Sequence, residues 1–175
     1  MKILSVRFAN INSLKGDFEI DFTNPELAGR GIFAITGRTG SGKTSILDAI
    51  TLALFGGTPR LDISTKENEL MSRGTGFCQA EVTFEAVVDG RQLRFRSRWE
   101  QRRARGKPDG ALQAAHMQLI QETDKRPGDT WESTRLSEVP GKVEEITGLD
   151  YKRFTRTCLL AQGQFAAFLE AKPNE

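Results

Sequence analysis

The chain has 175 residues, of which 38% are apolar and 27% charged, and its formal net charge is +2. This length suits one domain with its own core, and the composition excludes a disordered protein. No apolar run approaches the roughly 18 residues that a membrane-spanning helix needs, and the first residues lack the apolar stretch of a signal peptide. We therefore expect a cytoplasmic protein without a membrane partner.

The first half of the chain predicts strand, turn, strand, loop, strand and helix. Residues 2–10 have strand-like character, and residues 17–22 alternate apolar and acidic side chains, which is typical of a half-buried strand. Residues 32–35 form a short apolar run of the kind that is buried in a parallel sheet. Residues 43–55 carry apolar side chains at helical spacing, and Gly56-Gly57 predicts the end of that helix.

The second half predicts an antiparallel sheet followed by helices. Two alternating stretches, residues 80–88 and 92–100, flank Asp89-Gly90, which is a strong hairpin signal. A third strand is expected at residues 117–120, and helices are expected at residues 136–147, 150–160 and 165–171. We therefore predict an α/β fold in which parallel core strands are joined to an antiparallel β subdomain.

A glycine-rich stretch between the predicted apolar strand and the first helix matches the phosphate-binding pattern G-x-x-x-x-G-K-[ST] at every required position: Gly37, Arg38, Thr39, Gly40, Ser41, Gly42, Lys43 and Thr44. The glycines let backbone N–H groups turn inward toward phosphate oxygens, and the helix adds its positive N-terminal end. Lys43 can reach the β- and γ-phosphates, and the Thr44 hydroxyl can ligate magnesium. The stretch predicts binding of a nucleoside triphosphate, expected to be ATP with Mg²⁺, by a P-loop NTPase fold.

Hydrolysis needs more than this loop. A P-loop NTPase also uses a carboxylate for magnesium, normally an Asp after an apolar run, and a group that orients water. No apolar run of the chain ends in such an Asp, and Asp48 is interpreted as a residue on a solvated helix face. We expect part of the active site, including every catalytic residue, to be supplied from outside this chain.

The phosphate loop continues as Ser45-Ile46-Leu47-Asp48-Ala49-Ile50, and this extended stretch resembles the ABC-type ATPases related to structural-maintenance-of-chromosomes (SMC) proteins. Within that group the chain resembles the SbcC-type ATPase subunits of bacterial DNA double-strand-break exonucleases. The segments that carry the resemblance are 12–16, 58–61, 70–73, 147–151 and 161–169. They extend over essentially the whole chain.

The resemblance implies roles for several residues. Gln162 occupies the place of the family's Q-loop, where it would contact magnesium and sense the γ-phosphate. The same segment superficially resembles the family's signature motif, but Ala161 and Gln162 stand where that motif needs a serine and a glycine. Ser45 joins the phosphate-binding residues. Asn12, Ser13 and the segment ending in Arg73 would lie near the base and sugar, although related proteins often have Arg where Asn12 stands.

The resemblance also implies a larger assembly. Residues 1–175 would be the N-terminal half of an ATPase head, separated from the C-terminal half of the same polypeptide by a coiled coil. That C-terminal half would supply the Walker B, signature and catalytic residues. The expected partners are a second head that dimerises on ATP binding, a metal-dependent nuclease subunit and double-stranded DNA, in the nucleoid-associated cytoplasm of a bacterium. An ABC-transporter nucleotide-binding domain, another SMC-, RecF- or RecN-like repair ATPase and a P-loop kinase remain alternatives.

Basic residues gather in one part of the chain, between Arg91 and Lys107. Four of them are candidate contacts to the DNA backbone: Arg98, Arg102, Arg103 and Arg105. The alternative interpretation is a solvated strand face or a surface that pairs with the rest of the polypeptide. Trp99, Trp131, Tyr151 and Phe154 are expected to pack in the core, and Cys78 and Cys158 are expected to be buried thiols.

Overall fold

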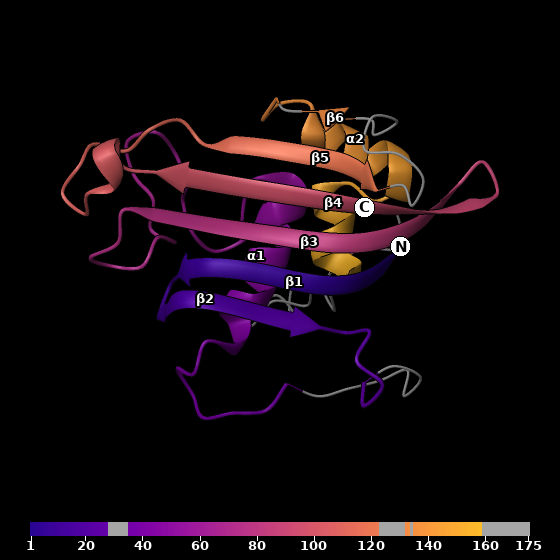
Figure 1. Cartoon of the computed structure of the whole chain (residues 1–175), viewed down its shortest axis with the longest axis horizontal. Helices are drawn as coiled ribbons and strands as arrows, with labels where there is room; N and C mark the ends of the chain where they lie inside the picture. Colours follow the sequence, from indigo (N-terminus) through magenta and orange to yellow (C-terminus); the bar gives the residue numbers. More distant parts are fainter. Residues whose placement is uncertain (28–34, 123–131, 134, 159–175) are drawn as a thin grey trace, which may run out of the picture.

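The computed structural model describes residues 1–27, 35–122, 132–133 and 135–158. A six-stranded sheet forms its main layer, and every pair of neighbouring strands is antiparallel (Figure 1). In spatial order the strands are β2 (Leu14–Asp21), β1 (Lys2–Ile11), β3 (Phe77–Val88), β4 (Arg91–Arg102), β5 (His116–Glu122) and β6 (Glu132–Ser133). The predicted antiparallel subdomain is therefore present.

The β3–β4 hairpin is the longest paired unit of the sheet and reaches past its neighbours (Figure 1). Its two turn residues, Asp89 and Gly90, have φ angles of 51° and 73°. Positive φ at both positions is the geometry of a type I′ turn, whose twist matches that of the strands. The predicted hairpin is confirmed, and both of its strands run slightly further than expected.

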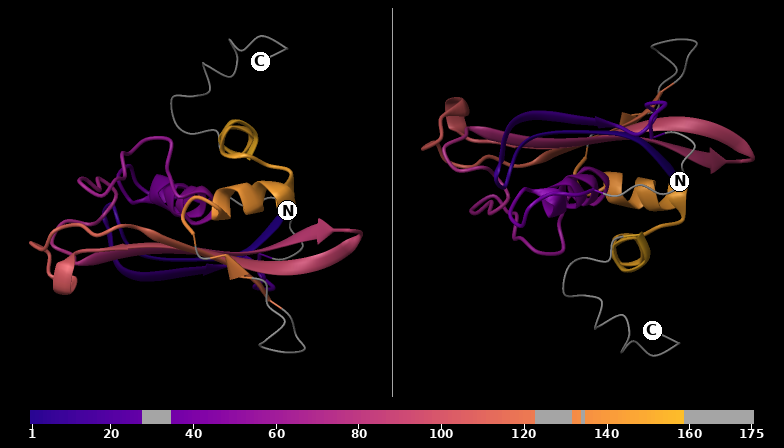
Figure 2. Two further views of the ribbon diagram at one scale, coloured as in Figure 1. Left: turned by 90° about the horizontal axis from the view of Figure 1, so that it is seen from above. Right: turned by 90° about the horizontal axis from the view of Figure 1, so that it is seen from below.

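The helices cover one face of the sheet (Figure 2). They are α1 (Lys43–Phe55), α2 (Val139–Thr147) and α3 (Tyr151–Arg153), which continues as a π-helical turn over Phe154–Cys158, and a short 3₁₀ turn lies at Ala104–Gly106. Helix α1 has the predicted bounds, and the left-handed Gly56 ends it by donating its N–H to the Leu52 carbonyl at 2.8 Å. Helix α2 begins later than predicted because Pro140 disfavours helix before it and fits only in the first turn.

The core lies between α1 and the sheet, where α1 packs on β1, β3 and β4. Trp99, Phe84 and Leu52 are fully buried there, and Phe154 packs on Phe55 with ring centroids 5.3 Å apart. Trp99 and Phe154 are thus core residues, as predicted, and Tyr151 packs at the edge of the same cluster. Trp131 lies outside the described residues.

Strand β2 differs from its prediction in burial. Ile20 and Phe22 are half-buried, but Phe18 is 38% exposed and stacks on Phe8 at the rim of the sheet. Alternating apolar and polar residues indicate which face of the sheet each side chain lies on, whereas its burial depends on what covers that face. Here β2 is an edge strand, and the sheet contacts of α1 are concentrated on β1, β3 and β4.

Some predictions concern residues that the structure leaves undescribed. The parallel strand at residues 32–35 lies outside the described residues except for Ile35, which is exposed and has no regular structure. The helix at residues 165–171 lies wholly outside them. Among the helices that are described, none combines the length and apolar character needed to cross a lipid bilayer.

Candidate functional site: the phosphate loop and its supports

The N-terminus of α1 is built to attract an anion. Its N-cap is Gly42, with φ at 86°, and no side chain caps the first turn or places an acidic group there. The first N–H groups of a helix have no carbonyl partner within it, and the helix dipole makes this end positive. An uncapped N-terminus therefore presents donors and positive potential to whatever lies in front of it.

The loop in front of this helix has the backbone that the glycine pattern predicts. Gly40 and Gly42 both lie in the left-handed region, with φ angles of 81° and 86°. Ser41 closes a turn by donating its N–H to the Arg38 carbonyl at 3.1 Å. Residues 35–41 are exposed, so the loop opens to solvent.

Lys43 places its ammonium group at the rim of the loop. Its Nζ donates to the carbonyls of Gly37 at 2.7 Å and Arg38 at 2.8 Å, and lies 3.5 Å from the Ser41 hydroxyl. These contacts hold a positive charge beside the uncapped helix end, where it can exchange carbonyl partners for phosphate oxygens. Thr44, the predicted magnesium ligand, lies half-buried in the first helical turn.

The turn between β1 and β2 lies beside the start of α1. Asn12, with φ at 51°, donates its N–H to the Leu70 carbonyl at 2.7 Å and accepts a bond from the Ser72 hydroxyl at 2.8 Å. The structure thus brings together the two segments that were predicted to flank the nucleoside. Ser13 and Arg73 are both exposed at this junction.

The structure contradicts the interpretation of Asp48 as a residue on a solvated helix face. Only 2% of Asp48 is exposed, so it does not lie on a solvated helix face. It forms an ion pair with Arg60 and accepts a bond from Asn12 Nδ2 at 3.3 Å. Helical periodicity alone cannot show that an arginine from a later loop covers a polar helix position, and sequence reasoning therefore missed both Asp48 and Arg60.

Gln162, the predicted Q-loop residue, lies outside the described residues, as does Ala161. Among the residues that are described, no group of three or more His, Cys, Asp or Glu side chains gathers as a metal site would require. The part of the predicted site that the structure places is therefore the phosphate loop, the Asn12 turn and the segment ending in Arg73.

The arginines of β4 line the sheet face opposite the helices, where they alternate with buried residues as predicted. Acidic partners accompany them: Arg94 pairs with Glu85 at 3.3 Å, and Arg96 pairs with Glu122 at 3.4 Å. The sequence of β4 alone does not predict these acidic partners, because Glu85 and Glu122 come from the neighbouring strands. This face is therefore a mixed charged surface.

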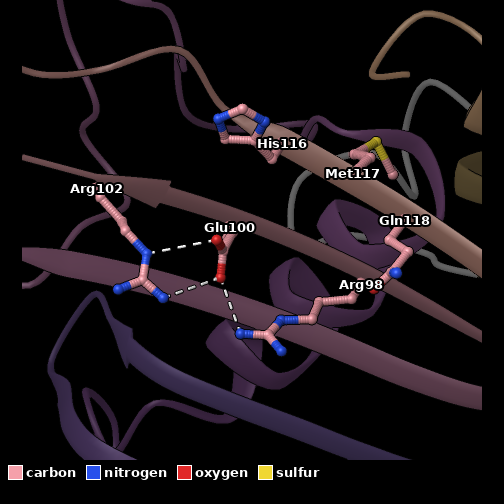
Figure 3. A pocket seen from close by; sticks show the side chains of 6 residues that line it. All are labelled: Arg98, Glu100, Arg102, His116, Met117 and Gln118. Atoms are coloured by element: carbon pink, nitrogen blue, oxygen red, sulfur yellow. Dashed lines mark hydrogen bonds and ion pairs between the residues drawn. The ribbon is translucent and has the colours of Figure 1, made fainter. Parts of the chain in front are cut away.

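A pocket of about 350 Å³ lies on this face, lined by Arg98, Glu100, Arg102, His116, Met117 and Gln118. Figure 3 shows Glu100 between the two arginines. Arg98 Nη2 lies 2.8 Å and Arg102 Nη2 3.3 Å from Glu100 Oε2. Burial opposes ionisation of Glu100, but the bonds and charges of both arginines together hold its pKa below its usual value.

The other two candidate DNA contacts lie in the loop after β4. Arg103 is half-buried and donates through Nη1 to the Gly110 carbonyl at 3.0 Å, so its guanidinium braces the loop. Arg105 is exposed, with φ at 57°, at the tip of the 3₁₀ turn. Of the four candidate arginines, Arg102 and Arg105 are the more exposed, whereas Arg98 and Arg103 are partly buried.

Comparisons with known proteins agree with this geometry. A family model described as an AAA domain matches residues 5–175. Over its whole length the chain is 43% identical to the SbcC subunit of the nuclease SbcCD from Pseudomonas aeruginosa, of which it spans 15%. It is 33% identical, over 97% of its length, to the "Probable DNA double-strand break repair Rad50 ATPase" of Aquifex aeolicus, and again spans 15% of that protein.

A solved structure from work on the ATP-driven dimerization and DNA-stimulated activation of SMC ATPases shares the fold. Its TM-score is 0.61 at 19% identity, and the match covers 99% of this chain and 93% of that one. The fold class and the SbcC-type resemblance predicted from the sequence are thereby confirmed. Because the family model matches nearly the whole chain, the protein belongs to this AAA-domain family, and its relatives include SbcC and Rad50 proteins.

Proposed function

We propose that this chain is the ATP-binding N-terminal segment of the ATPase subunit of a DNA double-strand-break repair nuclease. The observation that carries the proposal is the uncapped N-terminus of α1, faced by left-handed glycines and by the Lys43 ammonium group. Backbone donors, a helix dipole and a cation at one point suit a polyphosphate. The names of the SbcC and Rad50 relatives support the nuclease context.

Different residues of this site contact different parts of the nucleotide. The phosphate loop and Ser45 hold the triphosphate, while Asn12, Ser13 and Arg73 lie on the nucleoside side. Thr44 and Gln162 would hold a magnesium ion, which would neutralise phosphate charge when bound. Oxygen donors of this kind suit magnesium, and Thr44 stands directly after the lysine of the loop, where such a donor is needed.

The remaining machinery of the proposed enzyme comes from partners. These are the C-terminal half of the same polypeptide, a second ATPase head that dimerises on ATP binding, a metal-dependent nuclease subunit and double-stranded DNA, in the bacterial cytoplasm. The chain spans 15% of its SbcC relative, which leaves ample sequence for a coiled coil and a second half-head. Closure of two heads over ATP regulates the access of DNA to the nuclease.

The nucleotide proposal is tested by titrating the complete polypeptide with a fluorescent ATP analogue, with and without Mg²⁺. We expect saturable binding that Lys43→Ala reduces at least tenfold, since a charge-assisted bond to phosphate contributes about 1.5–3 kcal/mol. Lys142→Ala is the matched control, because Lys142 lies on α2 and pairs with Glu145 at 2.7 Å. Equal affinity of wild type and Lys43→Ala would refute the assignment of the loop.

The DNA proposal is tested by the salt dependence of DNA binding. Each phosphate contact contributes about 0.9 to the slope of log K against log salt concentration. Replacing Arg102 and Arg105 with alanine should lower that slope by about 2. Arg7→Ala is the control, because Arg7 lies on β1 and pairs with Glu19 at 2.8 Å. An unchanged slope in the double variant would remove these arginines from the DNA surface.

A further inference from the structure

Asp48 is a buried carboxylate to which the proposed function gives no role. Only 2% of it is exposed, one turn into α1 from Thr44. A carboxylate leaves water at a large cost unless donors and a counter-charge replace that water. Here Arg60 provides both, through an ion pair with Oδ2 and a second bond from Nε to Oδ1 at 3.4 Å.

The third donor to Asp48 comes from the nucleoside side of the site. Asn12 Nδ2 lies 3.3 Å from Asp48 Oδ2 and 3.0 Å from the Ser45 hydroxyl. Asn12 has a left-handed backbone with φ at 51°, which asparagine tolerates better than most residues. One carboxylate therefore ties α1 both to the β1–β2 turn and to the segment that carries Arg60.

From Asn12 the contact continues to the phosphate loop. The side chain of Leu14 lies so close to Gly42 that a Cβ added there would stand 2.8 Å from Leu14 Cδ2. Gly42 is the N-cap residue, directly before α1 begins at Lys43. The turn over residues 12–14 is therefore packed on the helix start at one end and held by Asp48 at the other.

We propose that Asp48 is a positioning residue for the nucleoside end of the ligand, acting through Asn12. The proposal rests on the proposed function and adds a residue to it. Asp48 bonds to Asn12 and Arg60 and makes no bond to the loop over residues 37–42. Releasing Asn12 therefore shifts the wall formed by Asn12, Ser13 and Arg73, while the triphosphate keeps its backbone donors and Lys43.

The test compares two ligands of the complete polypeptide, ATPγS and inorganic tripolyphosphate, each by competition with a fluorescent ATP analogue. Asp48→Asn removes the charge that both Asn12 and Arg60 contact, and it should raise the Kd for ATPγS about tenfold, as expected when Asn12 loses its charge-assisted bond, while leaving tripolyphosphate within about twofold. Asn12→Ala should also weaken ATPγS more than tripolyphosphate, by a smaller margin, because it removes the bond to the Ser45 hydroxyl on the triphosphate side as well. Glu145→Gln is the matched control, since it makes the same chemical change at a side chain that is 68% exposed on α2.

Exchanging the amide and the carboxylate between positions 12 and 48 distinguishes a positioning role from general destabilisation of the fold. Asn12→Asp sets two carboxylates against each other and should weaken ATPγS binding more than Asp48→Asn does. Combining the two changes restores one amide and one carboxylate but not the ion pair of position 48 with Arg60, so the double variant should bind ATPγS more tightly than Asn12→Asp alone. A structural fault would instead accumulate in the double variant.

The outcomes are distinct. Equal weakening of ATPγS and tripolyphosphate, or no change in either, would overturn the role of Asp48. If Asp48→Asn does not fold, Asn12→Ala decides the question, because Asp48 then keeps its Arg60 partner. If the wild-type protein binds neither ligand, the proposed function itself fails, and this result differs from every outcome that concerns Asp48 alone.

Discussion

A buried pair of amides, Asn68 and Gln101, fixes the loop between α1 and β3 onto the sheet. Asn68 Nδ2 donates to Gln101 Oε1 at 2.6 Å, and Asn68 Oδ1 accepts the Met71 N–H at 2.8 Å. Gln101 Nε2 in turn donates to the carbonyls of Ser64 at 2.8 Å and Gln113 at 2.9 Å. Gln101 is 1% exposed and Asn68 is 9% exposed, so water has little access to these groups.

Replacing Asn68 with alanine should destabilise the chain strongly. The change strands Gln101 Oε1 and the Met71 N–H, and each buried group left without a partner costs about 1–3 kcal/mol. We expect a loss of about 3 kcal/mol in the free energy of unfolding. Because about 1 kcal/mol shifts the melting temperature of a domain of this size by 2–4 °C, Tm should fall by roughly 6–12 °C.

Urea unfolding followed by circular dichroism measures this loss, and Asn24→Ala is its control. Asn24 also accepts a backbone bond, from the Glu26 N–H at 3.0 Å, but on an exposed turn where water replaces it. The control should change stability by about 0.5 kcal/mol or less. If Asn68→Ala and Asn24→Ala prove equally mild, the buried amides do not hold the loop, and the reasoning fails.

Burial raises the pKa of the Cys78 thiol to about 12. In the unfolded chain the thiol ionises near pH 8.5, whereas the folded one stays protonated, so the free energy of unfolding should fall as pH rises above about 8.5. Urea titrations at pH 10 should show a loss that is roughly 1–2 kcal/mol larger for wild type than for Cys78→Ala. Gly42→Ala should lower Tm more than Gly40→Ala. Both positions have a left-handed backbone, which costs an alanine about 1–2 kcal/mol, but only an alanine at position 42 would clash with the Leu14 side chain. In a Leu14→Ala background the two variants should therefore have equal effects. Ser97 is fully buried and donates to an α1 carbonyl at 2.6 Å, so Ser97→Ala should lose about 1–3 kcal/mol in the same titration.

Local signals were enough to predict the helix that follows the phosphate loop and the β3–β4 hairpin. Helix α1 was predicted to the residue because its apolar spacing and Gly56 both act within the helix itself. The hairpin at Asp89 and Gly90 was predictable for the same reason, since turn geometry depends on the two residues that form it. The loop motif also placed Lys43 correctly at the start of the helix.

Contacts between distant segments were beyond sequence reading. Asp48 was taken for a solvated side chain because its partners, Asn12 and Arg60, come from segments on either side of α1. The arginines of β4 were predicted to form a basic cluster, and their partners Glu85 and Glu122 were not foreseen because those residues stand on neighbouring strands. Strand pairing and loop closure decide such contacts, and neither is encoded in local periodicity.

Three of the polar contacts between distant segments lie in one part of the structure. The amide pair at Asn68 and Gln101, the Arg60 contact to Asp48 and the Ser72 contact to Asn12 all hold the loop between α1 and β3. That loop also carries Arg73, which we propose lies on the nucleoside side of the site. A wall that is held by its own hydrogen bonds loses little conformational freedom on binding, so more of each contact appears as affinity. Variants that loosen this loop should therefore weaken nucleotide binding even where they touch no ligand atom.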